Sequence, residues 1–134
     1  MKPFAGQAVL LVDDEAPVRE AIAMLLGFLG ASVTQAGSGE EALAQFAPDR
    51  FALVVLDYNM PVMNGIVLAE TLKQRAPNQP IIMIRGFVDQ LQRAGNLSNA
   101  INVLLPKPCP LVQLSEALRQ LGFATTLVPL RAEG

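Results

Sequence analysis

Five short apolar segments, separated by amphipathic ones, constrain the fold of this chain more than any other feature of its sequence. They are rich in valine, leucine and isoleucine, and they span Ala8–Val12, Ser32–Ala36, Ala52–Leu56, Pro80–Ile84 and Ile101–Leu105. Most are apolar at every position, which indicates strands buried on both faces of a sheet. We therefore expect a parallel sheet that is covered by helices on both sides.

The segments between these runs have the spacing of amphipathic helices. Apolar residues recur three or four positions apart over Val18–Leu29 and again over Leu111–Leu121, as they do on one face of a helix. We expect Gly30 to end the first of these helices, because glycine readily takes the left-handed conformation of a C-cap. Ser38 and Glu41 have the spacing of a capping box and predict the start of a helix between the second and third strands.

Strand and helix alternate five times, which predicts one three-layer α/β domain with a parallel sheet. The weakest part of the pattern is Gly86–Ala100, where few apolar residues follow a helical period, so we expect a short or irregular fourth helix there. A length of 134 residues suits a single domain. We assign the domain to residues 1–124 and a short C-terminal tail to residues 125–134.

Composition excludes several classes of protein. Ten lysines and arginines against twelve aspartates and glutamates give a net charge of −2, which offers no basic surface to nucleic acid. The apolar runs are too short to span a bilayer, and no signal-peptide pattern follows Met1, so no membrane partner is expected. A single cysteine, Cys109, cannot form an internal disulfide, which favours the cytoplasm. The absence of histidine excludes histidine-based triads and most zinc sites.

Charged residues stand at the ends of four of the five predicted strands. The first run is followed by Asp13 and Asp14, the third by Asp57, the fourth by Arg85 and the fifth, one residue later, by Lys107. In an open parallel sheet, ligands bind at the carboxyl ends of the strands. We therefore expect three carboxylates and two cations to converge on one edge.

This set of groups is suited to phosphoryl transfer. Carboxylates a few ångströms apart repel one another, and Mg²⁺ removes that cost because oxygen ligands suit it. A carboxylate held beside the metal can attack phosphorus and form an aspartyl phosphate. We take Asp57 as the acceptor, Asp13 and Asp14 as metal carboxylates, and Lys107 as the cation that neutralises charge on the transferring oxygens.

Three motifs resemble the receiver domains of two-component response regulators, of which chemotaxis regulators are examples. The acidic triplet Asp13–Glu15 follows a strand as in the family's first strand and acidic pair, and Asp57–Gly65 is similar to its acceptor strand end and following loop. Lys107 and Pro108 resemble the family's lysine and the proline after it, whose peptide bond is usually cis. The match covers roughly residues 7–122, and three motifs in this order are far more specific than any one of them.

The resemblance implies a flavodoxin-like (βα)5 sandwich with strand order 2-1-3-4-5. It also implies that Mg²⁺ is bound by Asp14, Asp57 and the main-chain carbonyl of Asn59, with Asp13 acting through a metal-bound water. Lys107 would then contact the phosphoryl group.

The function implied is that of a phosphorelay switch, not an enzyme in the usual sense. A sensor histidine kinase or phosphotransfer protein would donate the phosphoryl group to Asp57. In the family the output surface lies over the fourth helix, fifth strand and fifth helix, here Phe87–Leu121, and it would bind a downstream protein partner. A homodimer through the same face is a further option.

Two residues depart from the family pattern. Arg85 stands where receivers carry a serine or threonine that hydrogen-bonds a phosphoryl oxygen, and Leu104 stands where they carry a tyrosine or phenylalanine that reports phosphorylation. We consider three hypotheses for the Arg85 guanidinium. It donates to the phosphoryl oxygens in place of the hydroxyl, it is a counter-ion that weakens metal binding, or it points to solvent.

Two alternatives follow from these departures and from the aspartyl-phosphate chemistry. The first is a pseudo-receiver, a protein-interaction module that keeps the fold but is not controlled by phosphorylation. The second is a phosphatase of the haloacid dehalogenase type, which needs an Asp-x-Asp arrangement after the first strand. Asp13, Asp14 and Glu15 do not provide it, because Glu15 occupies the second position.

Overall fold

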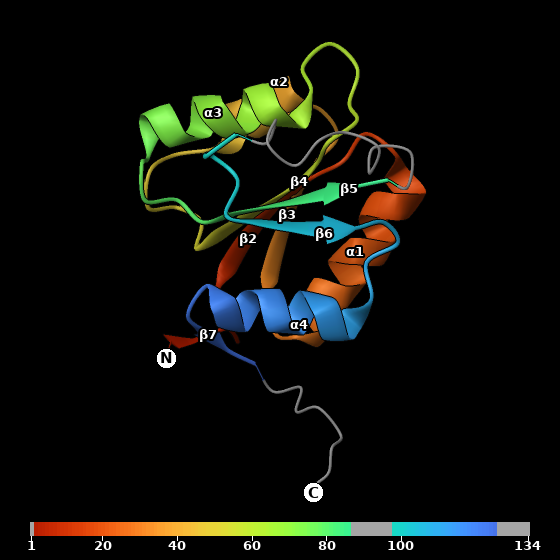
Figure 1. The fold of residues 1–134 in the computed structure, drawn as a ribbon, viewed down its shortest axis with the longest axis vertical. Coiled ribbons are helices and arrows are strands. Elements are labelled where there is room, and N and C mark those ends of the chain that lie inside the picture. The colour runs from red at the N-terminus through yellow and green to blue at the C-terminus, as the bar shows by residue number, and fades with distance from the viewer. Residues whose placement is uncertain (1, 87–97, 126–134) are drawn as a thin grey trace, which may run out of the picture.

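A five-stranded parallel sheet forms the centre of the protein (Figure 1). A computed structural model describes residues 2–86 and 98–125 of the chain. The sheet strands are β2 (Ala8–Val12), β3 (Ser32–Ala36), β4 (Leu53–Asp57), β5 (Ile81–Arg85) and β6 (Val103–Pro106). The helices in the described part are α1 (Ala16–Phe28), α2 (Gly39–Gln45), α3 (Gly65–Arg75) and α4 (Leu111–Gln120). Helices α1 and α4 cover one face of the sheet, and α2 and α3 cover the other.

The strand order confirms the expected fold. It is β3-β2-β4-β5-β6, which is 2-1-3-4-5 when the five predicted strands are counted along the chain. The first two strands have the predicted bounds, whereas the other three begin and end one or two residues later than predicted. The later ends arise because Asp57 still pairs with Ile84 and Arg85 with Pro106, so two of the charged residues are part of the strands.

Two apolar cores lie on opposite faces of the sheet. On β4, Leu53 and Val55 belong to the core under α1 and α4, and Val54 and Leu56 to the core under α2 and α3. This alternation explains why the strand sequence is apolar at every position. Cys109 is buried in the first core, where it packs as a small apolar side chain, and its burial raises the pKa of the thiol to about 11.

Both predicted helix boundaries are confirmed. Gly30 follows α1 with φ of 106°, and a Cβ there would lie 2.8 Å from the Cα of Ala5. The hydroxyl of Ser38 accepts a hydrogen bond from the N–H of Glu41 (3.0 Å) at the start of α2. The carboxylate of Glu41 accepts from the N–H of Gly37 (2.6 Å), one residue before the N-cap.

The sequence did not predict a second, two-stranded sheet. Strand β1 (Lys2–Pro3) pairs in parallel with β7 (Phe123–Ala124), and the ring of Phe4 packs edge-on against that of Phe123 with their centroids 5.4 Å apart. This pairing joins the two ends of the described chain on the side of the domain near α4 (Figure 1). Residues 87–97, most of the predicted fourth helix, lie outside the described residues, and so does the predicted tail except for Thr125.

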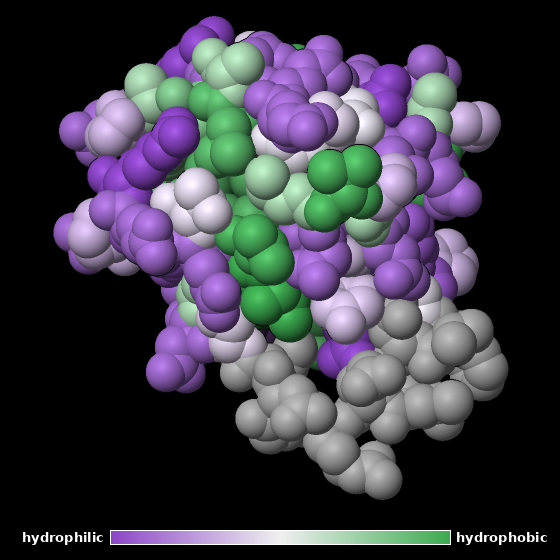
Figure 2. Space-filling view, turned by 90° about the horizontal axis from the view of Figure 1, so that it is seen from above, coloured by the Kyte–Doolittle hydropathy of each residue, from purple (hydrophilic) through white to green (hydrophobic). Residues whose placement is uncertain are grey.

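The surface on the side of α2 and α3 carries an apolar band among polar residues (Figure 2). Val67 on α3 is 48% exposed.

Within residues 2–86 and 98–125, we find no helix with the length and apolar character that a membrane span requires.

We expect Phe4→Ala to lower the free energy of unfolding by about 3–5 kcal/mol, because it empties a fully buried ring site. The matched control is Phe28→Ala, since Phe28 is 69% exposed and its loss should cost less than about 0.5 kcal/mol. Urea unfolding of both variants measures the difference. Equal losses in the two variants would show that the β1–β7 pairing does not anchor Phe4.

Candidate functional site

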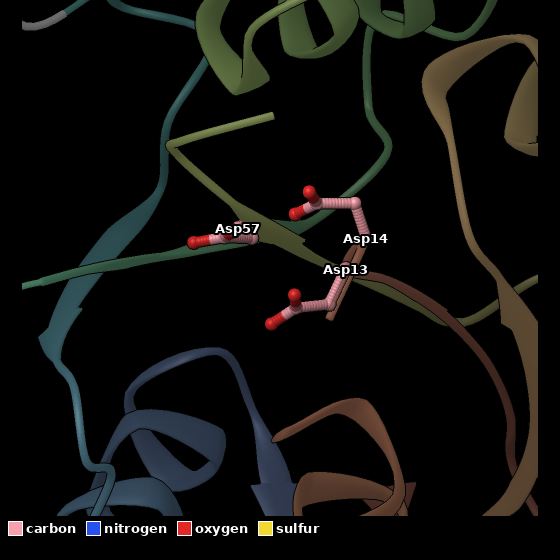
Figure 3. Close-up of side chains that lie close together, drawn as sticks. All are labelled: Asp13, Asp14 and Asp57. Carbon is pink, nitrogen blue, oxygen red and sulfur yellow. The ribbon is translucent and has the colours of Figure 1, made fainter. Parts of the chain in front are cut away.

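Three carboxylates meet at the carboxyl edge of the sheet. Asp57 is the last residue of β4, and Asp13 and Asp14 directly follow the adjacent strand β2. One carboxylate oxygen from each of the three lies within 4.8 Å of the others, and Figure 3 shows the side chains reaching toward a shared space. Asp13 and Asp57 are 1% and 3% exposed, whereas Asp14 is exposed. The two buried carboxylates therefore need compensation from nearby groups.

Lys107 supplies a positive charge to this cluster from the far side of β5. Its Nζ donates a hydrogen bond to Oδ1 of Asp57 (3.0 Å) and lies 3.3 Å from Oδ2 of Asp13 and 3.6 Å from Oε1 of Glu15. The bond from Lys107 to Pro108 is cis, as the resemblance implies. Four predicted site residues, the three aspartates and this lysine, are thus brought together.

Burial sets the protonation of the central carboxylate. Burial, together with the charge of Asp13, raises the pKa of Asp57 from 3.8 to about 6, although hydrogen bonds from Lys107 and the main chain of Asn59 oppose this rise. Burial also lowers the pKa of Lys107, but its contacts with Asp57 and Asp13 outweigh burial and leave that pKa above its ordinary value. Asp57 therefore remains an anion near neutral pH, and Lys107 remains a cation.

The residues at this edge fit a bound divalent cation. Oδ1 of Asp13 accepts a hydrogen bond from the N–H of Glu15 (2.9 Å), but Oδ2 is buried and has no hydrogen-bond partner within the described residues. The ammonium of Lys107 lies 3.3 Å away without forming that bond. A buried oxygen left in this way costs about 1–3 kcal/mol, and a hard cation such as Mg²⁺ would satisfy it. The role predicted for the carbonyl of Asn59 stays a prediction.

The loop that follows β4 is fixed at both ends. Residues 58–64 connect β4 to α3, and the N–H of Gly65 donates to the carbonyl of Tyr58 (3.0 Å). A Cβ on Gly65 would lie 2.5 Å from the carbonyl oxygen of Asp57, so α3 begins in direct contact with the Asp57 backbone. At the loop's outer part, Val62 has φ of 71° and is 91% exposed.

The two departures from the family pattern lie in different surroundings. Arg85 is 5% exposed, and its Cζ lies 5.4 Å from the centroid of the Tyr58 ring. The interpretation that Arg85 points to solvent is therefore wrong, because the guanidinium is packed on an aromatic face. Leu104, on β6, is 37% exposed.

Sequence reasoning missed three contributors to this site. Tyr58 was not among the predicted site residues, although Asp57 pairs with Ile84 and the residues that follow them are neighbours. Glu15 reaches Lys107, and Arg19 donates to the carbonyl of Asp13 (2.7 Å). The strand register would have indicated the contact between Tyr58 and Arg85, whereas no sequence motif marks Arg19 as part of the site.

The family comparison agrees with this geometry. Residues 9–119 match the family model of the response regulator receiver domain. The chain belongs to this family. Among curated relatives, the response regulator MprA of Mycolicibacterium vanbaalenii is 36% identical over 118 residues, which cover 88% of this chain and 51% of the relative. MprA of Mycobacterium ulcerans is 34% identical over 119 residues, which cover 89% and 51%. The receiver domain thus spans about half the length of the curated relatives it matches.

Solved structures show the same fold. A response regulator receiver domain protein from Clostridium thermocellum superposes with a TM-score of 0.78 at 26% identity, covering 85% of this chain and 92% of that one. The response regulator TrrA of Thermotoga maritima, solved in complex with Mg²⁺-BeF, gives a TM-score of 0.76 at 28% identity, with coverage of 86% and 98%. That relative carries Mg²⁺, and the receiver domain described here has an acidic cluster suited to it.

We expect Asp57→Asn to stabilise the metal-free protein at alkaline pH. Since the pKa of Asp57 in the folded state is raised to about 6, the folded state loses stability as pH rises from about 4 through 6 and the buried carboxyl ionises. The asparagine variant avoids this cost, which amounts to roughly 3 kcal/mol above pH 6 and vanishes near pH 4.

Urea unfolding with a chelator, at about pH 4 and about pH 8, measures this difference. Asp14→Asn serves as a control because Asp14 is exposed, and it should change the free energy of unfolding little at either pH. A stabilisation by Asp57→Asn that is equal at both pH values would contradict the assigned cause.

Proposed function

We propose that this receiver domain accepts a phosphoryl group on Asp57 from a sensor histidine kinase or a phosphotransfer protein. The observation that carries the proposal is the buried Asp57 carboxylate, hydrogen-bonded to Lys107 at 3.0 Å and within 4.8 Å of two further carboxylates. Membership of the receiver family supports it. The domain then works as a signalling switch in a two-component phosphorelay and not as an enzyme that turns over a substrate.

The residues of this chain suggest how the transfer proceeds. A carboxylate oxygen of Asp57 attacks the phosphorus of a phosphohistidine, the new O–P bond forms, and the P–N bond breaks with its electron pair returning to the imidazole. With its pKa raised to about 6, Asp57 is ionised at neutral pH and is ready as a nucleophile. Lys107, already in contact with Asp57, neutralises charge on the phosphoryl oxygens.

Mg²⁺ is the cofactor that we propose for this transfer. Asp13, Asp14, Asp57 and the main-chain carbonyl of Asn59 would hold it, with Asp13 acting through a water. When bound, the cation supplies charge neutralisation for the transferring oxygens. The buried Oδ2 of Asp13, which has no hydrogen-bond partner within the described residues, supports this assignment.

Output is proposed to pass to a protein partner through the Phe87–Leu121 face. Residues 87–97 of this face lie outside the described residues. In its described part, Leu104 and Val112 are 37% and 53% exposed, which gives a protein partner apolar side chains to contact. A homodimer through the same face stays a prediction.

A second candidate function is the pseudo-receiver, which is motivated by Arg85. A buried guanidinium replaces the expected hydroxyl, so this protein departs from the usual way of contacting the phosphoryl group. In the pseudo-receiver, the domain would bind its partners without phosphorylation. Phosphorylation of the purified protein separates the two functions.

We expect one phosphoryl adduct when the protein is incubated with a small-molecule phosphodonor and Mg²⁺. The adduct should be absent without Mg²⁺ and absent in Asp57→Asn, because that variant lacks the nucleophilic carboxylate. Intact mass spectrometry is the measurement. Failure to form the adduct at high Mg²⁺ and donor would place the pseudo-receiver first.

We expect Arg85→Thr to leave Mg²⁺ affinity within about twofold of the wild type, because the guanidinium rests on Tyr58 in the metal-free protein. Asp13→Asn should weaken Mg²⁺ binding at least about tenfold, since it removes a buried carboxylate charge. Isothermal titration calorimetry measures both affinities. A clear gain in affinity for Arg85→Thr would instead identify Arg85 as a counter-ion that opposes the metal.

A further inference from the structure

Arg85 and Tyr58 lie side by side immediately beyond the acceptor. Asp57 pairs with Ile84 across β4 and β5, and the N–H of Tyr58 donates to the carbonyl of Ile84 (2.9 Å). The next residue on β5 is Arg85, whose guanidinium lies over the Tyr58 ring at 5.4 Å. The strand register therefore places the cationic residue Arg85 one position beyond the strand partner of Asp57, the residue that would carry the phosphoryl group.

The contact is one that a phosphoryl group would disturb. A guanidinium on an aromatic face gains a moderate attraction from the ring quadrupole. Its planar fork forms stronger, charge-assisted hydrogen bonds with phosphate oxygens, often two at once. Phosphorylation of Asp57 would add negative charge beside Arg85, where both residues are buried to 95% or more, so the attraction would be little screened by water.

The usual reporter of the family has no aromatic ring here. Leu104 is a partly exposed leucine on β6, and it stands where the family has a tyrosine or phenylalanine. Tyr58 has an aromatic ring and is partly exposed at the start of the loop to α3. Its ring is also in contact with Arg85, which replaces the serine or threonine of the family.

We propose that Arg85 and Tyr58 form the phosphoryl-responsive switch of this receiver domain. The guanidinium rests on the Tyr58 ring in the unphosphorylated protein and moves to the phosphoryl oxygens when Asp57 is phosphorylated. The ring of Tyr58 is then uncovered and carries the signal to the surface around the β4–α3 loop. This inference rests on the proposed function, because it requires a phosphoryl group on Asp57.

The chain carries its own reporter for the test. Tyr58 is the one tyrosine, and the sequence contains no tryptophan, so tyrosine fluorescence reports the Tyr58 ring alone. Beryllofluoride with Mg²⁺ is the probe, used as a phosphoryl mimic on the full chain. Quenching of the emission by acrylamide measures how far the ring is covered, and ¹⁹F NMR measures how much adduct has formed.

In the wild type, we expect the quenching constant to rise at least about twofold when the adduct forms, because the guanidinium leaves the ring. Arg85→Gln keeps a long polar side chain but lacks the charge, so its quenching constant should be high from the start and should not respond to the adduct. Arg50→Gln is the matched control, since Arg50 lies over the Phe51 ring at 5.1 Å, away from the acceptor edge. It should respond as the wild type does.

Two results would overturn the switch and leave the proposed function standing: an adduct that forms without a change in quenching, or an Arg85→Gln variant that responds like the wild type. Absence of any adduct in the wild type would overturn both proposals. Should Arg85→Gln fail to fold, the wild type alone decides through the ¹H–¹⁵N spectrum of its arginine side chains. There the Arg85 Nε–H signal should lose the upfield shift from the Tyr58 ring and move downfield with the adduct, and a signal that stays in place overturns the switch.

Discussion

One ammonium group lies between two buried carboxylates, and the carboxyl edge of the sheet depends on that contact. Asp13 and Asp57 stand on adjacent strands and are nearly inaccessible to water, so their charges repel at short range. Lys107 lies close to both, at 3.3 and 3.0 Å, from a strand that is separated from β4 by β5. The ion cluster thus connects the last strand of the sheet to the central strands, and removing the ammonium of Lys107 would leave both buried carboxylates uncompensated.

The sequence predicts most of the fold because the determinants are local. Ala8–Val12 is apolar throughout because residues on both faces of β2 enter a core, and Ser38 with Glu41 caps α2 within four residues of chain. Strands β1 and β7 were missed because two residues carry no periodicity. Their pairing depends on the contact between Phe4 and Phe123, which are 119 positions apart in the sequence.

The candidate site was predictable to the extent that it follows from strand ends. Asp13, Asp57 and Lys107 converge because parallel strands end at one edge, and the structure brings them together. The direction of the Arg85 side chain does not follow from that rule. It depends on the register of β4 against β5, which brings Arg85 beside the ring of Tyr58 and which composition and spacing do not reveal.

The fixed ends of the β4–α3 loop have a consequence for how this protein can diversify. There is no room for a side chain at Gly65 beside the Asp57 carbonyl, and the N–H of Gly65 donates to the carbonyl of Tyr58. Residues 58–64 therefore form a loop whose two ends are held together. Its exposed outer part, where Val62 lies, can change in sequence or length without moving Asp57. The surface that this loop presents can therefore be altered independently of the carboxylates and the lysine beneath it.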